Sequence, residues 1–119
     1  MKWYENLYLG ESVTEKKANR IKWKLNHNAG VLSYYVIAFP SNPDNLLDLI
    51  PTKELKQKGY PKKDICVIGL AKGYEEAVAV VQQIVSETYQ NTKDVNIRKY
   101  LKEYRRKDEW RFFLRYLRS

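Results

Sequence analysis

The chain has 119 residues, and its 22 Lys+Arg against 14 Asp+Glu give a net charge of +8. This length predicts a core of its own, while the lone Cys66 excludes an internal disulfide and, with the one histidine, His27, is too little for a zinc cluster. No apolar run approaches the roughly 18 residues that cross a bilayer, and MKWYENLYLGES is too polar for a signal peptide, so we expect a cytoplasmic protein without metal or cofactor.

The first elements in chain order are a short strand and an amphipathic helix. Weak alternation in YENLYL, residues 4–9, predicts the strand. SVTE matches the capping box, with Ser12 at the N-cap and Glu15 three residues later, and it predicts a helix over about 13–28. Gly30 is expected to supply a left-handed C-terminal cap. The apolar stripe of this helix comprises Val13, Ala18, Ile21 and Leu25.

The next segment is rich in β-branched and aromatic residues. VLSYYVIAFP, residues 31–40, predicts a strand buried on both faces, followed by a turn in SNPDN. NLLDLI, residues 45–50, is compatible with a helix that begins at Asn42-Pro43-Asp44, or with the second strand of a hairpin. The hairpin is favoured because Pro51 would cut such a helix to about two turns. TKELKQKG, residues 52–59, then predicts a short helical turn closed by Gly59.

The best-defined unit combines a strand and a helix. Residues 65–70 predict a central strand, and Gly73 opens a helix with Glu75 and Glu76 in its first turn. The pattern as a whole predicts an α+β fold: a small antiparallel or mixed sheet of three to four strands packed by two main helices, plus a basic C-terminal helix. We expect an α+β core domain, 1–92, and a basic aromatic helical extension, 93–119. The apolar face of the second helix comprises Ala77, Val78, Val81, Ile84, Val85 and Tyr89.

Three stretches of this chain resemble a recurrent set of short bacterial proteins. They are YLGES, YYVIAFPS and IGLAKGYEEA, and the resemblance covers about residues 4–90. No activity is established for that group. The resemblance therefore implies a bacterial cytoplasmic protein and no mechanism.

The residues that most often perform chemistry have structural explanations here. His27 suits the C-terminal end of a helix, where a cation complements the dipole, and Cys66 lies within an apolar strand, where a thiol behaves as a small hydrophobe. GLAKG, residues 69–73, matches neither nucleotide-binding fingerprint, and Glu75 and Glu76 put negative charge where a phosphate would bind. No catalytic residue is predicted, and we expect a protein that is not an enzyme.

Most of the positive charge lies at the C-terminus. Residues 93–119 contain ten basic and four acidic side chains, a net of +6, whereas residues 1–92 have a net of +2. On a straight helix at about 100° per residue, a first apolar stripe before residue 105 and a second one after it point in different directions. Either the chain bends around RRKDE, residues 105–109, so that both pieces cover the same core, or the last segment leaves the domain. The first stripe is Ile97, Tyr100, Leu101 and Tyr104, and the second is Trp110, Phe113, Leu114 and Leu117.

A line of cations accompanies the second stripe and supports a first functional hypothesis. The protein is predicted to be a small non-enzymatic module that binds nucleic acid, DNA or RNA, largely through phosphates. Three cations of the first helix are expected to assist. The predicted nucleic-acid-binding residues are Lys107, Arg111, Arg115 and Arg118 in the C-terminal segment and Lys16, Arg20 and Lys24 in the first helix.

Other interpretations of the C-terminal segment stay open. In a protein-interaction or adaptor module, or in a homodimer, Trp110, Phe113, Leu114 and Leu117 would insert into a groove of the partner. A solvated helix packed on its own core would also show one basic and one apolar stripe. Contact with a membrane surface has suitable residues but is weakened by Asp108.

Overall fold

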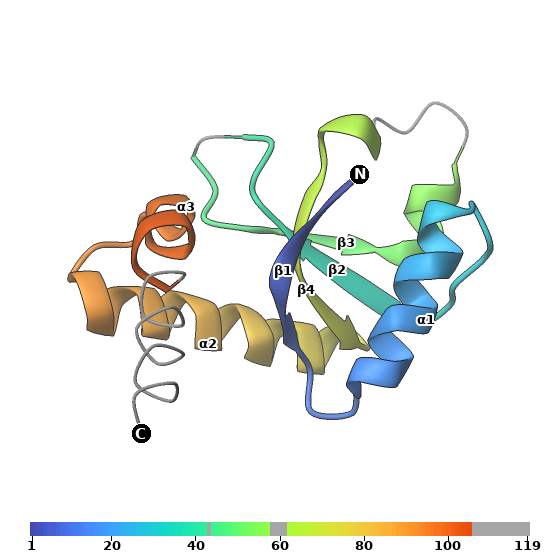
Figure 1. Ribbon diagram of the computed structural model, residues 1–119, viewed down its shortest axis with the longest axis horizontal. Helices are drawn as coiled ribbons and strands as arrows, with labels where there is room; N and C mark the ends of the chain where they lie inside the picture. Colours follow the sequence, from blue (N-terminus) through green and yellow to red (C-terminus); the bar gives the residue numbers. More distant parts are fainter. Residues whose placement is uncertain (43, 58–61, 106–119) are drawn as a thin grey trace, which may run out of the picture. The chain divides into compact units, whose positions relative to one another are not determined.

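The central element is a mixed four-stranded sheet with the order β1-β4-β2-β3 (Figure 1). Its strands are β1 (Lys2–Leu9), β2 (Tyr34–Ala38), β3 (Asp48–Pro51) and β4 (Cys66–Lys72). β4 is antiparallel to β2 and parallel to β1. This computed structural model describes residues 1–42, 44–57 and 62–105. It confirms the predicted α+β class and shows that the sheet is mixed.

The chain divides into two compact units, Met1–Gln83 and Ile84–Ser119. The first contains the sheet, α1 (Glu15–Asn26), the 3₁₀ helices Thr52–Lys56 and Lys62–Asp64, and the first part of α2, which spans Tyr74–Thr92. The second contains the rest of α2, α3 (Ile97–Lys99) and a π-helical segment, Tyr100–Arg105. The predicted boundary at residue 92 stays a prediction.

Residues 45–50 belong to a hairpin, as favoured from the sequence. β2 and β3 pair antiparallel, and Val36 lies opposite Ile50. The side chain of Asp48 closes the turn, because its Oδ2 accepts hydrogen bonds from the backbone N–H and the hydroxyl of Ser41, at 3.0 and 3.2 Å. Pro43 lies outside the described residues. The 3₁₀ helix Thr52–Lys56 matches the expected helical turn, with Gln57 as its C-cap, and Gly59 lies outside the described residues.

Helix α1 begins and ends at residues other than those predicted. Thr14, not Ser12, is the N-cap, and its hydroxyl accepts from the backbone N–H of Lys17 at 3.2 Å. At the other end, Asn28 takes the left-handed conformation predicted for Gly30, with φ 57°. The backbone N–H of Ala29 then donates to the carbonyl of Lys24 at 2.8 Å, which is the hydrogen bond of a Schellman cap. Asparagine tolerates this conformation better than most residues with a side chain.

The predicted stripe of α1 is buried against one face of the sheet. Val36 and Ala38 of β2 belong to the same apolar cluster, so Ile37, which lies between them, points to the other face. Ile37 is also completely buried, which confirms that β2 is covered on both faces. Gly69 of β4 permits close packing, because a Cβ there would lie 3.0 Å from the carbonyl oxygen of Tyr8. The cluster includes Val13, Ala18, Ile21, Leu25, Val31, Val36, Ala38, Ile50, Leu55, Val67 and Leu70.

Helix α2 follows Gly73, whose φ of 81° requires a glycine-like backbone. The buried side of α2 includes a polar residue that was not assigned to it from the sequence. Thr88 is fully buried, and its hydroxyl donates to the carbonyl of Ile84 at 2.8 Å. Tyr89, assigned to the apolar face, is 53% exposed, so that assignment is wrong. A threonine that satisfies its hydroxyl within the helix can replace an apolar residue in a buried row.

After α2 the described backbone forms two short helical elements, α3 and a π-helical segment. α3 has three residues and is capped by Asn96, whose Oδ1 accepts from the backbone N–H of Lys99 at 3.1 Å. The π-helical segment follows directly, and its i→i+5 bonding changes the number of residues per turn. The value of 100° per residue therefore does not apply to residues 100–105. The first apolar stripe is buried at Ile97, Tyr100 and Leu101.

The second apolar stripe and its line of cations lie outside the described residues. These are Trp110, Phe113, Leu114 and Leu117, with Lys107, Arg111, Arg115 and Arg118.

Candidate functional site

Three of the predicted site residues lie together on the outer face of α1. Lys16 and Arg20 are exposed and Lys24 is half-buried. At about 100° per residue, Arg20 and Lys24 lie about 40° and 80° around the axis from Lys16. The buried residues Ile21 and Leu25 occupy the opposite side of the helix. Successive cations are about 6 Å apart along the axis, so they form a row about 12 Å long.

Two aromatic side chains complete this face, and sequence reasoning missed one of them. Trp23 is 60% exposed, and its ring stacks on that of His27, with centroids 4.2 Å apart and planes at 21°. His27 Nδ1 lies 2.7 Å from the carbonyl oxygen of Trp23. A carbonyl only accepts, so Nδ1 holds the proton in this contact. His27 is the C-cap of α1, so its predicted position at the end of the helix is confirmed. The i,i+4 spacing of a tryptophan and a histidine outside the apolar stripe was the available signal.

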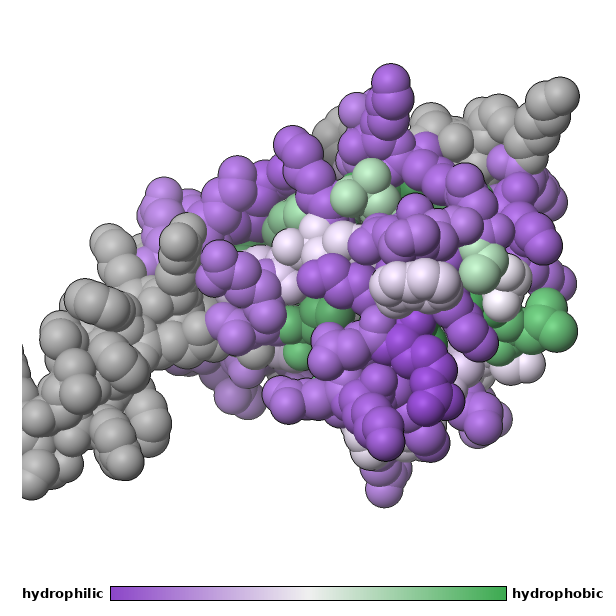
Figure 2. Space-filling model, turned by 45° about the vertical axis from the view of Figure 1, so that its right-hand side comes forward, coloured by the Kyte–Doolittle hydropathy of each residue, from purple (hydrophilic) through white to green (hydrophobic). Residues whose placement is uncertain are grey.

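The outer face of α1 contains no carboxylate of that helix. Glu15, its one acidic residue, lies about 100° away from Lys16. Lys22, at the margin of the buried side, places its ammonium 5.6 Å from the centroid of the Trp3 ring. The indole N–H of Trp3 donates to Oδ1 of Asn26 at 3.0 Å, which ties α1 to β1. Figure 2 brings forward the side of the molecule on which α1 lies in Figure 1, and it shows that hydrophilic residues cover most of this side.

The C-terminal end of α1 gathers further ammonium groups from other elements. Lys62 Nζ donates to Oδ1 of Asn28, the left-handed residue that follows the helix. Lys56 extends to Gly30, where its Nζ lies 3.6 Å from the position of a Cβ. Both lysines lie near the negative end of the helix dipole, which favours cations. The positive field of α1 therefore continues beyond its last turn.

A second constellation surrounds Glu76 at the start of α2. Its Oε2 accepts from the hydroxyl of Ser12 at 2.7 Å, and its Oε1 accepts from the backbone N–H groups of Ser12 and Lys72, at 3.2 and 3.3 Å. Burial raises the pKa of Glu76, but these hydrogen bonds and the charge of Lys72 outweigh it and hold the pKa below its usual value. A Cβ at Gly10 would overlap this carboxylate.

The Glu76 constellation is a structural clamp. It joins the loop before α1 to the first turn of α2, 64 residues later in the sequence. Glu76 lies in the first turn of α2, as predicted, but its carboxylate binds Ser12 and Lys72. An ionised carboxylate that already accepts three hydrogen bonds is poorly placed for proton transfer, and it occupies the position where the helix start would bind an anion.

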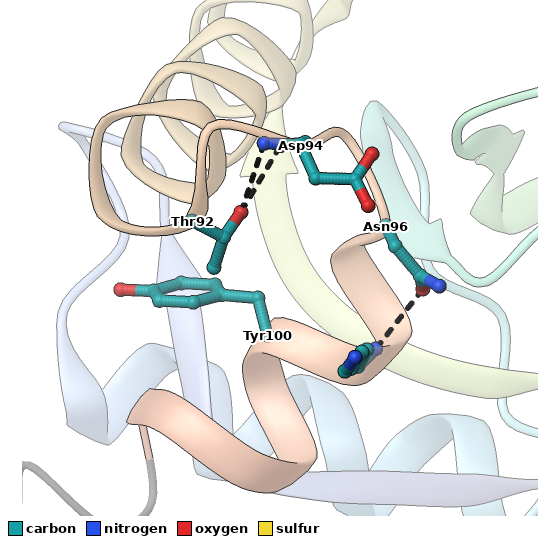
Figure 3. Close-up of a pocket in the computed structure, with 5 residues that line it drawn as sticks. Thr92, Asp94, Asn96 and Tyr100 are labelled. Carbon is teal, nitrogen blue, oxygen red and sulfur yellow. Dashed lines mark hydrogen bonds between the residues drawn. The ribbon is translucent and has the colours of Figure 1, made fainter.

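The turn between α2 and α3 contains a small hollow of about 70 Å³ (Figure 3). Its polar groups are engaged within the turn. The Thr92 hydroxyl donates to the carbonyl of Thr88 at 2.7 Å and accepts from the backbone N–H of Asp94 at 3.2 Å. Oδ1 of Asp94 accepts from the backbone N–H of Val95 at 2.7 Å. The Tyr100 ring lies beneath Thr92 and directs its hydroxyl away from Asp94. The hollow is a feature of the turn, and no chemistry follows from it.

Two further properties bear on function. Among residues 1–42, 44–57 and 62–105, no group of three or more His, Cys, Asp or Glu side chains is arranged to hold a metal ion. In the same described part of the chain, no helix is both long enough and apolar enough to span a membrane.

Comparison with protein-family models, with curated proteins and with solved structures found no match for this chain. The residues themselves must therefore support any functional conclusion. The strongest described candidate is the outer face of α1, which we call the α1 platform. It consists of Lys16, Arg20, Trp23, Lys24 and His27.

Proposed function

We propose that this protein is a small module that binds nucleic acid without being an enzyme, and that the α1 platform is part of its binding surface. The observation that supports this most directly is the row Lys16, Arg20 and Lys24 on a helix face with no carboxylate of its own. Phosphate oxygens are the natural partners of such a row, and arginine offers paired donors to them. Two lysines at the end of the helix, Lys56 and Lys62, extend the field.

Contacts of this kind act through the backbone of the nucleic acid. A row of about 12 Å covers about three nucleotides at 3.4 Å each. Binding is therefore weakly dependent on sequence and strongly dependent on salt, because each neutralised phosphate releases counterions. The C-terminal cations Lys107, Arg111, Arg115 and Arg118 belong to the same proposal, on the basis of the charge pattern of the sequence.

The test is a salt titration of binding to mixed-sequence DNA and RNA oligonucleotides, by fluorescence anisotropy. We expect binding at low salt and a steep loss as salt rises. In the variant Lys16→Gln/Arg20→Gln, the slope of log K against log salt should fall by roughly 0.7–0.9 for each lost contact. The charge-matched control Lys2→Gln/Lys99→Gln removes two exposed lysines elsewhere and should keep the slope of the parent.

Absence of binding at low salt to every oligonucleotide overturns the proposal. The alternative is then a protein-interaction or homodimerising module anchored by Trp110, Phe113, Leu114 and Leu117, which light scattering of the same samples would test through the molar mass. An equal loss of slope in the control variant would also contradict a specific role for α1, because it would show that only net charge matters.

A further inference from the structure

The aromatic half of the α1 platform is not explained by folding. Trp23 lies on the side of α1 opposite the buried residues, and it is 60% exposed although His27 covers one face of its ring. The exposed area must therefore lie on the other face and the edges of the indole. A large aromatic side chain stabilises a fold mainly through the area that it buries. An indole that faces solvent therefore contributes little to the stability of the core.

The indole is also held in one orientation before any ligand arrives. The His27 ring lies beneath it at 4.2 Å, and His27 is itself fixed by the hydrogen bond from Nδ1 to the carbonyl oxygen of Trp23. A side chain that is already ordered loses less conformational entropy when it binds. The free face of Trp23 is therefore a rigid, flat and apolar surface on the same side of α1 as Lys16 and Arg20.

This surface distinguishes two forms of nucleic acid. In a duplex the faces of the bases are stacked on one another and cannot reach a flat ring on a convex helix. In a single strand an unpaired base can stack on an aromatic ring while the adjacent phosphates contact basic side chains. Arg20, three residues before Trp23, lies next to it on the helix surface, and Lys24 lies farther around the same helix. We infer that the α1 platform binds single-stranded nucleic acid, with one unpaired base stacked on Trp23; this inference rests on the proposed function.

The experiment compares a mixed-sequence 12-nucleotide single strand with the 12-base-pair duplex of the same sequence, using the full chain. We expect tighter binding of the single strand. Trp23→Leu should weaken binding of the single strand by about 10-fold, because stacking on one base is worth about that much or more. It should leave duplex binding within about twofold, because the cations remain. Trp23→Phe, which keeps an aromatic ring, should recover part of the loss.

A matched control is Tyr74→Leu at the start of α2. Tyr74 is 61% exposed, nearly the same as Trp23, but lies outside the platform. The Tyr74→Leu variant should bind the single strand and the duplex with the same affinities as the parent protein. Circular dichroism of Trp23→Leu should show that α1 remains folded. If the substitution unfolded the protein instead, binding of the duplex would fall together with binding of the single strand, and that result differs from the one expected.

The outcomes separate the two proposals. If single strand and duplex bind equally and Trp23→Leu changes neither, the stacking inference is overturned while phosphate binding stands. Preference for the duplex overturns it as well. If neither ligand binds at low salt, the proposed function itself fails, and the exposed Trp23 beside Arg20 is then a surface for a protein partner.

Discussion

Helices α1 and α2 bury similar amounts of apolar side chain but have opposite charge. α1 has five basic residues and one acidic residue, a net of +4, whereas α2 has three acidic residues and no Lys or Arg, a net of −3. α2 is solvated by residues such as Gln82, Gln83 and Ser86. The comparison shows that an amphipathic helix in this protein does not need cations to remain in water. Because the three carboxylates of α2 solvate that helix equally well, the sign of the charge on α1 is what the proposed binding explains.

The two helices also start differently. α1 is capped locally, by the hydroxyl of Thr14 on the backbone N–H of Lys17. The start of α2 depends on a long-range contact, between the carboxylate of Glu76 and Ser12. A local cap forms with its own helix, whereas the Glu76 clamp requires the loop before α1 to be in place. α2 therefore gains part of its stability only when the first unit is folded.

The largest effect should come from the buried faces, where the two helices are alike. We expect Leu25→Ala in α1 and Ile84→Ala in α2 each to lower the free energy of unfolding by about 2–5 kcal/mol, because each leaves a cavity at a residue no more than 5% exposed. Urea denaturation measures both. Asn19→Ala, on the exposed side of α1, should stay within about 0.5 kcal/mol of the parent. A small effect of Leu25→Ala would show that α1 is not packed as described.

The next effect concerns the outer faces, where the helices differ. Gln82→Lys/Ser86→Lys on α2, combined with Lys16→Gln/Arg20→Gln on α1, moves two charges between exposed sites and leaves the net charge at +8. Affinity for single-stranded oligonucleotides should remain about tenfold below that of the parent, because hydrogen bonds to charged groups contribute about 1.5 kcal/mol or more. Fluorescence anisotropy measures this. Full recovery of affinity would show that only the net charge of the protein matters, and not which helix carries the cations.

The smallest effect concerns the helix starts. Glu76→Gln and Ser12→Ala should each lower the free energy of unfolding by about 1–2 kcal/mol at pH 7. The double variant should lose less than the sum, because both changes break one clamp. Glu75→Gln, an exposed neighbour in the same turn, should cost about 0.5 kcal/mol or less. Urea denaturation of the four variants tests the clamp, and strict additivity would contradict it.

The Glu76 clamp also predicts a pH dependence with a definite sign. The pKa of Glu76 in the folded protein is lowered, so the contribution of its ionised form is complete above the unfolded value of about 4.3 and is lost as pH falls through the folded value. The stability difference between the parent and Glu76→Gln should therefore shrink below about pH 4. A difference that grows toward acid pH would have the wrong sign.

Much of the local structure was predictable from the sequence because its signals are local. The 3.6-residue stripe of Ala18, Ile21 and Leu25 predicted α1, and the hairpin and the central strand β4 followed from short apolar runs bounded by turn residues. Lys16, Arg20 and Lys24 were predicted to act together, and they share one face because helical spacing alone determines that. Trp23 was within reach of the same reasoning, because it lies four residues before His27.

Other features depended on residues far apart in the chain. The sequence by itself determined the main helices α1 and α2, the strands β2 and β4, and which side of α1 is cationic, because side-chain periodicity decides this within a few turns. Only the tertiary structure decided that β1 pairs parallel with β4, that Ser12 serves Glu76 instead of capping α1, and that Thr88 replaces Tyr89 in the buried row of α2. Such choices follow from competition among hydrogen-bond partners and from packing, and these are settled when distant segments meet.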